Sequence, residues 1–83
     1  MGFRPVFSDT AVAFFTTLGR RKQLKLIDLA QQLAAAPSVV PDFRSKDETG
    51  RDISHLLIDD FLFEYWVDGA VRLVMILNIE DAE

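Results

Sequence analysis

Few side chains in this sequence are of types that perform chemistry on a substrate. His55 is the only histidine, cysteine is absent, and Arg51 and Arg72 lie on either side of His55 in the sequence. A histidine can act as a general base, and an arginine can stabilise negative charge that develops in a transition state. Arg51, His55 and Arg72 are therefore the weak catalytic candidates. Each also has a structural alternative. A lone histidine on a strand is often structural, Arg51 is able to pair with Asp42 or Asp47, and Arg72 is able to pack at the core edge.

Other kinds of chemical site have little support. Asp59-Asp60 and Glu80-Asp81 are paired acids, but no histidine lies at metal-ligand spacing from them, and their places in a turn and after the last strand explain them. The GRDISH stretch, residues 50–55, is neither a phosphate-binding loop nor a nucleophile elbow. We expect no metal and no cofactor.

Charge is unevenly distributed along the chain. The net charge is −4, with five basic and two acidic residues in 1–37 against four basic and eleven acidic residues in 38–83. An acidic protein has little general affinity for free nucleic acid, because that affinity depends on neutralising phosphates. One basic cluster, RRKQLK at 20–25, is predicted to contact a target; the alternative is a solvated helix start. Its basic residues are Arg20, Arg21, Lys22 and Lys25.

Length and composition predict one small globular domain, residues 1–83. A chain of 83 residues buries only about 60–65% of its unfolded surface, so the core is small. The hydrophobic content of 49% excludes a disordered chain. The absence of cysteine suits a reducing cytoplasm, and no apolar run approaches the ~20 residues of a membrane span. We expect a cytoplasmic protein with no membrane partner.

The first part of the chain predicts a short strand followed by a helical hairpin. Residues 3–7 alternate in character, and Pro5 favours a place at the sheet edge because proline has no N–H to donate. Ser8 is a suitable N-cap for a helix that Gly19 closes. A second helix over residues 20–36 follows at once, so the two helices should pack antiparallel.

The second part predicts a loop and three strands. Residues 37–51 are the longest irregular stretch, and we expect Phe43 to pin this loop to the core. Asp68-Gly69 predicts a two-residue type I′ turn. The fold class is α+β in the order β-α-α-β-β-β, with a helical hairpin on one face of a mainly antiparallel four-stranded sheet. The three later strands are expected at 52–58, 61–67 and 71–79.

The expected turn at 68–69 also fixes a register for the last hairpin. It pairs Val67 with Ala70, Tyr65 with Arg72 and Phe63 with Val74. The bulky face with Phe61, Phe63 and Tyr65 is assigned to the helices. The opposite face is left uncovered, and such an apolar patch on a small domain usually marks a site for a partner or a second copy. The predicted partner-binding residues are Leu62, Trp66, Val71, Leu73, Met75 and Leu77.

One alternative use of this apolar face remains open. The 37–51 loop carries Val39, Val40 and Phe43, which are able to fold over the face and bury it within the same chain. In that case the face is core and not a binding surface.

Five stretches, in this order along nearly the whole chain, resemble the RelE/ParE family of toxins from bacterial type II toxin–antitoxin modules. They are FSDTAVAFFTTLG, LAAAP, PDFRSKDETGRDI, EYWVDGAVR and ILNIEDA. The resemblance implies an α+β fold, a cytoplasmic protein, and a cognate antitoxin that holds the activity in check. It also implies one of two activities. RelE-like members cleave mRNA on the ribosome with basic residues and a terminal Tyr or His, whereas ParE-like members poison DNA gyrase without that set.

The ribonuclease set implied by the resemblance is mostly missing. Ile53 and His55 stand where cleaving members place lysines, and Leu62 stands where they place an arginine. After the last strand, cleaving members have an arginine and a terminal Tyr or His. This chain instead has Glu80, Asp81, Ala82 and Glu83.

The resemblance therefore favours a toxin component that acts through protein binding, with weak or absent ribonuclease activity. An alternative is an active ribosome-dependent mRNA endonuclease that uses Arg51, His55 and Arg72. A second alternative is a degenerate, non-toxic homologue that serves as a dimerisation or antitoxin-binding module. The expected partners are an antitoxin, the ribosome or gyrase, and a second copy of the chain.

Overall fold

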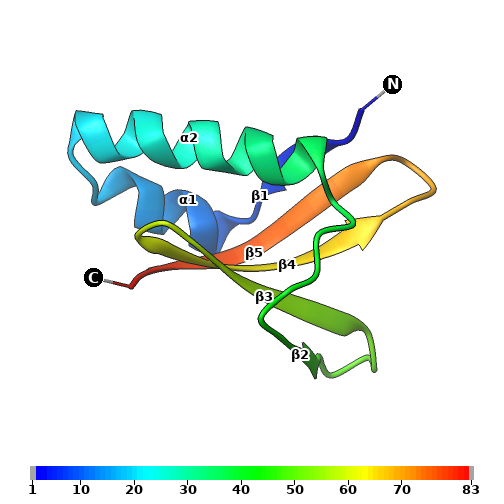
Figure 1. Ribbon diagram of the computed structural model, residues 1–83. Coiled ribbons are helices and arrows are strands. Elements are labelled where there is room, and N and C mark those ends of the chain that lie inside the picture. Colours follow the sequence, from blue (N-terminus) through cyan, green and yellow to red (C-terminus); the bar gives the residue numbers. More distant parts are fainter. Residues whose placement is uncertain (1, 83) are drawn as a thin grey trace.

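Residues 2–82 are described by a computed structural model, and they form two helices and a five-stranded mixed sheet (Figure 1). The α+β class is as predicted. Glu83, part of the acidic ending, lies outside the described residues. The elements in chain order are β1 (Arg4–Phe7), α1 (Asp9–Thr16), α2 (Arg20–Ala35), β2 (Phe43–Lys46), β3 (Asp52–Ile58), β4 (Phe61–Asp68) and β5 (Leu73–Asp81).

The sheet has the strand order β1-β5-β4-β3-β2. β1 runs parallel to β5 at one edge, as its proline predicted, and the other neighbours are antiparallel. The strand count differs from the prediction, because β2 forms within the expected 37–51 loop. All four of its residues are exposed. β2 is therefore held by backbone pairing with β3 and not by burial of its side chains. Its sequence for this reason has no hydrophobic pattern that would predict a strand.

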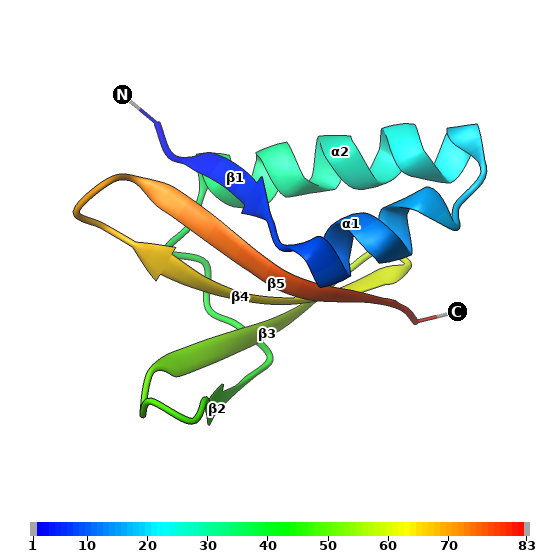
Figure 2. The ribbon, with the colours of Figure 1, turned by 180° about the vertical axis from the view of Figure 1, so that it is seen from behind.

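Both helices lie on one face of the sheet and run antiparallel, as expected (Figures 1 and 2). They cover β1, β5 and β4, whereas the β2–β3 hairpin extends away from them. Ser8 caps α1, since its Oγ accepts a hydrogen bond from the Ala11 N–H at 3.1 Å. The same hydroxyl donates to the Leu77 carbonyl at 2.6 Å, which joins the helix start to β5. Gly19 was expected to close α1; it is instead the N-cap of α2.

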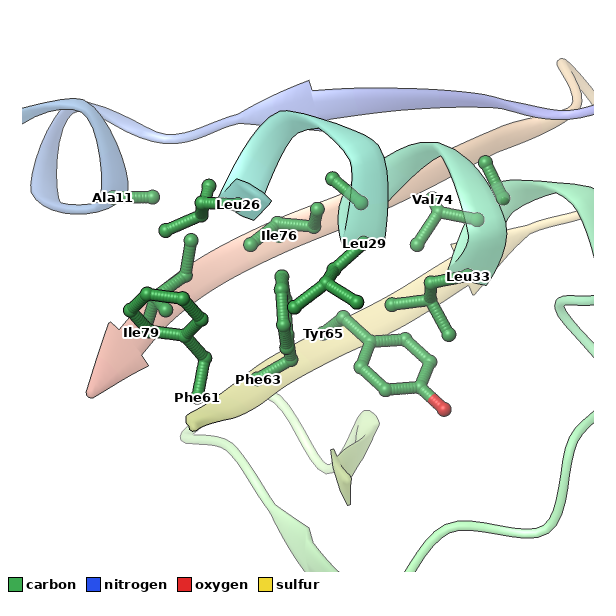
Figure 3. Packing of buried hydrophobic residues seen from close by; sticks show 12 residues of the cluster. Ala11, Leu26, Leu29, Leu33, Phe61, Phe63, Tyr65, Val74, Ile76 and Ile79 are labelled. Carbon is green, nitrogen blue, oxygen red and sulfur yellow. The ribbon is translucent and has the colours of Figure 1, made fainter. Parts of the chain in front are cut away.

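The core lies between the helices and the sheet (Figure 3). The helices cover the Phe61/Phe63/Tyr65 face, as the bulk of these side chains predicted. Phe14 of α1 meets Phe61 edge to face, with ring centroids 6.1 Å apart. The buried cluster consists of Ala11, Leu26, Leu29, Ala30, Leu33, Ala34, Phe61, Phe63, Tyr65, Val74, Ile76 and Ile79.

The predicted register of the last hairpin is wrong. Val67 pairs with Val74 and Tyr65 with Ile76, so four residues, 69–72, connect the strands. The left-handed residue of this loop is Arg72, with φ 58°, and not a glycine, so the type I′ turn is also wrong. For β4 and residues 73–76 the slip leaves the face assignment unchanged. It spans four residues there, and side chains alternate with a period of two.

A β-bulge between Glu64 and Tyr65 changes the pairing further along β5. Glu64 pairs with Asn78 and Tyr65 with Ile76, which leaves Leu77 as the extra residue. Ile76 and Ile79 can then both enter the core although they are three positions apart. The bulge therefore sets which β5 side chains remain for the opposite face.

The predicted anchoring of the 37–51 loop by Phe43 is wrong. Phe43 is 54% exposed, and Pro41 is the buried residue of this loop. The loop is also tied to β3 by Asp42, whose Oδ2 accepts from the Leu57 N–H at 2.7 Å. Among residues 2–82, no helix is both long and apolar enough to cross a membrane.

Candidate functional site

The sheet face turned away from the helices is the candidate functional site, and we call it the open face. Its centre is formed by Trp66 and Met75, which are paired across β4 and β5, with Val6 of β1 next to Met75. The open face keeps four of the six predicted partner-binding residues, all partly exposed: Leu62, Trp66, Leu73 and Met75. A fifth, Leu77, is the extra residue of the bulge in β5 and is also partly exposed.

Val71 does not belong to the open face as predicted. It lies in the 69–72 loop and is 59% exposed. The same register error moves Arg72 out of the strand, where it was expected opposite Tyr65. Arg72 is placed in the loop, and its carbonyl accepts from the Arg4 N–H at 3.0 Å. The structure therefore does not bring Arg72 into line with His55, which lies in the middle of β3.

The hydrophobic side chains of the 37–51 loop do not bury the open face. Val40 is 78% exposed, and Phe43 is more than half exposed. Val39 lines a separate cavity with Leu33 and Leu56, on the side of the helices. The loop thus runs along the β3 side of the core.

The end of the β2–β3 loop does reach over the open face. The Arg51 guanidinium lies 4.0 Å from the centroid of the Trp66 ring, a cation–π contact. Ile53, which strand alternation places on the same face next to Trp66, is buried. Arg51 also pairs with Asp47, Nη1 to Oδ2, at 3.7 Å. The Asp47 pair is the structural role considered for Arg51 from the sequence, whereas the contact with Trp66 was not expected.

The turn that positions Arg51 is organised by the Asp47 carboxylate. Its Oδ1 accepts from the Thr49 hydroxyl at 2.7 Å and from the backbone N–H groups of Thr49 and Arg51, each at 2.9 Å. The Thr49 hydroxyl, and then the Arg51 N–H, hold the pKa of Asp47 below its ordinary value. Gly50 completes the turn with φ +84°, a left-handed conformation that glycine adopts without steric cost.

His55 lies on the open face with partners on β2. Its ring stacks on Phe43 with centroids 4.2 Å apart and planes 10° from parallel, and its Nε2 is 2.8 Å from the Ser45 Oγ. On the next strand Glu64 is paired with His55, and the Glu64 carboxylate accepts from the Asn78 amide at 3.1 Å. A row of four side chains therefore crosses the sheet from β2 to β5: Phe43, His55, Glu64 and Asn78. Phe43 and Ser45 were missed from the sequence, because the stretch F-R-S-K at 43–46 has one apolar residue and no apolar–polar alternation that would indicate a strand.

The predicted target-contact cluster lies on α2, in the helical layer. Lys22 pairs with Asp81 at 3.3 Å, and Lys25 pairs with Asp60 at 3.2 Å. These ion pairs tie the first half of α2 to the end of β5 and to the β3–β4 turn. Arg20 and Arg21 are exposed. The cluster and the open face thus lie on opposite sides of the sheet and do not form one site (Figure 1).

The described residues offer little to a metal ion. No group of three or more His, Asp or Glu side chains among residues 2–82 has the geometry to hold one. In each of the acid pairs 59–60 and 80–81, one carboxylate is engaged by a lysine of α2: Asp60 pairs with Lys25 and Asp81 with Lys22.

Comparison with known proteins gives similarity at the level of structure. No protein-family model and no curated protein matches the sequence. A solved structure of the toxin–antitoxin complex RelBE2 from Mycobacterium tuberculosis matches with a TM-score of 0.80 and 18% identity over 98% of this chain and 99% of that chain. The archaeal RelE–RelB complex from Pyrococcus horikoshii matches with a TM-score of 0.73 and 14% identity, covering 99% of this chain and 97% of that chain.

A mutant E. coli toxin RelE in the free state also matches, with a TM-score of 0.72 and 16% identity over all of this chain and 86% of that chain. These likenesses cover the two helices and the sheet together. At this level of identity they establish the architecture, which agrees with the resemblance seen in the sequence motifs. The chain has the fold of the RelE toxins.

Proposed function

We propose that this chain is the toxin component of a type II toxin–antitoxin module, that a cognate antitoxin neutralises it, and that it acts in the cytoplasm through protein binding. The fold shared with chains of two toxin–antitoxin complexes, over 99% and 97% of those chains, and with the free RelE toxin, over 86% of that chain, supports the toxin role. The observation that carries the binding mode is the open face, a partly exposed apolar surface that neither helix covers and over which, of the described residues, only Arg51, at the end of the β2–β3 loop, lies. Exposed apolar patches on small domains mark protein-interaction sites.

The chemistry of the open face supports weak or absent ribonuclease activity. Phosphodiester cleavage needs a base, an acid and cations around the developing phosphate charge. His55 is stacked on Phe43 and bonded to Ser45, and Arg51 is engaged with Trp66 and Asp47. The Glu64 carboxylate, on the strand next to His55, adds charge that repels a phosphate backbone.

The primary test is growth of a bacterial host after induced expression, with transcript 5′ ends mapped in the same culture. We expect growth arrest without new 5′ ends. Met75→Glu places a charge in the middle of the open face and should relieve the arrest, whereas the control Val40→Glu alters an exposed residue of the loop and should leave it. Arrest that persists in Met75→Glu would contradict the role of the open face. DNA breaks during arrest would identify gyrase as the target.

The second candidate function is ribosome-dependent mRNA cleavage. The specific observation in its favour is that Arg51 and His55 are both on the open face, which places one guanidinium and one imidazole on the same surface. Arrest with new 5′ ends that Arg51→Ala and His55→Gln abolish would establish this function and overturn the protein-binding mode. No arrest at all would favour a degenerate, non-toxic binding module.

A further inference from the structure

The step from Asp68 to Gly69 lies where β4 ends and the 69–72 loop begins. An aspartate followed by glycine closes readily to a cyclic imide, because glycine has no Cβ to hinder its amide nitrogen. In a folded chain the reaction also depends on the surroundings. The nitrogen must be free of the sheet, the carboxyl group must lie over it, and no neighbour must occupy the space of the ring.

The Gly69 N–H is not used by the sheet. The Ser8 N–H bonds the Ile76 carbonyl at 2.9 Å, so this carbonyl faces β1. Carbonyl direction alternates along a strand, which turns the Leu73 carbonyl toward β4. Asp68 and Leu73 are register partners, and they therefore form a hydrogen-bonded pair. Gly69 lies just beyond this pair, and its N–H donates to no acceptor within residues 2–82.

The Asp68 carboxylate is turned toward the backbone that follows it. Its Oδ1 accepts from the Ala70 N–H at 3.1 Å. This bond to the residue two positions further along is an Asx turn, in which the side chain lies over the intervening peptide. The carboxyl carbon of Asp68 is therefore held over the Gly69 peptide, whose nitrogen is the atom that must reach it.

The space around Gly69 is open. A Cβ added at Gly69 would meet no atom within 4 Å, and both Gly69 and Ala70 are exposed. The ring can therefore form without displacing a neighbour. Gly69 also has no left-handed φ, so alanine fits at this position without backbone strain.

We propose that Asp68 of the folded chain converts spontaneously to isoaspartate through a cyclic imide with Gly69. The Gly69 nitrogen bonds to the carboxyl carbon of Asp68, a C–O bond of that carboxyl group breaks, and its hydroxyl leaves with the amide proton as water. Water then opens the ring. Attack at the side-chain carbon restores aspartate, whereas attack at the main-chain carbon leaves the backbone running through the side chain, which is isoaspartate. Water is the only co-reactant.

The product alters the border of the open face. Isoaspartate lengthens the main chain by a CH₂ group, and the carbonyl of Asp68 that faces Leu73 becomes a free carboxylate outside the backbone. The pair with Leu73, a partly exposed residue of the open face, is therefore disrupted. The inference goes beyond the function proposed above and holds whether or not the chain is toxic.

The test is incubation of the purified chain at neutral pH and body temperature for several weeks, followed by peptide mapping. The two isomers have equal mass and separate by chromatography, and an isoaspartyl methyltransferase transfers a labelled methyl group to isoaspartate alone. We expect isoaspartate to accumulate at position 68. Asp42 and Asp59 are exposed acids followed by residues that have a Cβ, so they serve as references within the chain and should stay unchanged.

Gly69→Ala is the matched variant. Its added methyl group hinders ring closure without strain, so conversion should slow at least several-fold while circular dichroism stays that of the parent. Asp68→Asn closes the same ring with loss of ammonia and should convert faster than the parent at neutral pH, which a gain in mass reports.

Three results overturn the proposal: no isoaspartate forms at position 68, Gly69→Ala converts as fast as the parent, or conversion occurs only when urea unfolds the chain. The last result would show that the fold protects Asp68. The isoaspartate form, separated by ion exchange, should unfold at a lower urea concentration than the parent. An unchanged midpoint would contradict the loss of the pair with Leu73.

Discussion

The contact between Arg51 and Trp66 predicts a measurable coupling between the β2–β3 loop and the open face. The 4.0 Å separation is well inside the ~6 Å range of cation–π attraction. The Arg51 side chain is 44% exposed, so the contact belongs at the lower end of that scale, about 0.5–1 kcal/mol. For a domain of this size the loss corresponds to a fall of roughly 2–8 °C in the melting temperature.

A double-mutant cycle isolates this energy. Arg51→Ala, Trp66→Leu and the double variant are unfolded in urea and followed by far-UV circular dichroism, and we expect a coupling of about 0.5–1 kcal/mol. Trp66 is the only tryptophan, so its emission reports on the same contact. Arg51→Ala should shift the emission to longer wavelength, because water replaces the guanidinium over the ring.

Arg44→Ala provides the control for this cycle. Arg44 is an exposed arginine of β2 whose register partner, Ser54, lies on the opposite face from Trp66. It should show no coupling to Trp66→Leu. A coupling to Arg51 below about 0.2 kcal/mol, together with unchanged emission, would refute the reasoning and leave the open face fully uncovered.

Three further predictions concern the core, a turn and a titrating side chain. Phe63→Ala removes a fully buried ring and should lower the free energy of unfolding by about 3–5 kcal/mol in urea titrations. Asp59 has φ 51° in the β3–β4 turn, so Asp59→Gly should raise the free energy of unfolding by about 0.5–1 kcal/mol. Thr49→Val removes the hydroxyl that most lowers the pKa of Asp47, so NMR titration should find that pKa closer to its ordinary value. A carboxyl whose pKa is lowered by folding stabilises the folded state above its unfolded pKa, and this stabilisation is lost as the pH falls through the folded pKa. The free energy of unfolding of Thr49→Val should therefore decrease less with falling pH than that of the parent chain.

Each of these predictions has its own control. Val40→Ala, at an exposed position, should stay within about 0.5 kcal/mol of the parent. Asp59→Ala should lower the free energy of unfolding where the glycine raises it, and equal effects would exclude left-handed strain as the cause. Thr49→Ser keeps the hydroxyl and should leave the Asp47 pKa low. A normal Asp47 pKa in the parent chain would contradict the turn described here.

The sequence by itself determined the local elements and the faces of the hairpin. Ser8 as an N-cap and Pro5 at an edge act through the few residues around them, and the structure agrees with both. The division between the buried Phe63 face and the open Trp66 face was also predicted correctly. It survived a wrong register, because up to the bulge the slip spans an even number of residues, which keeps the side chains of β4 and of residues 73–76 on their predicted faces.

Only the tertiary structure decided which residues meet across the sheet. β2 exists through pairing with β3, and the bulge that leaves Leu77 unpaired depends on how β4 and β5 fit the same core. Arg51 reaches Trp66, and Ser45 reaches His55, through strand pairing and a turn that the sequence analysis took for an irregular loop. Ion pairs such as Lys22 to Asp81 join residues 59 positions apart. Local propensity acts over a few residues, whereas these contacts depend on the packing of the whole chain. The sequence alone therefore predicted the faces and most apolar residues of the open face, but not the contacts that Arg51 and His55 make there.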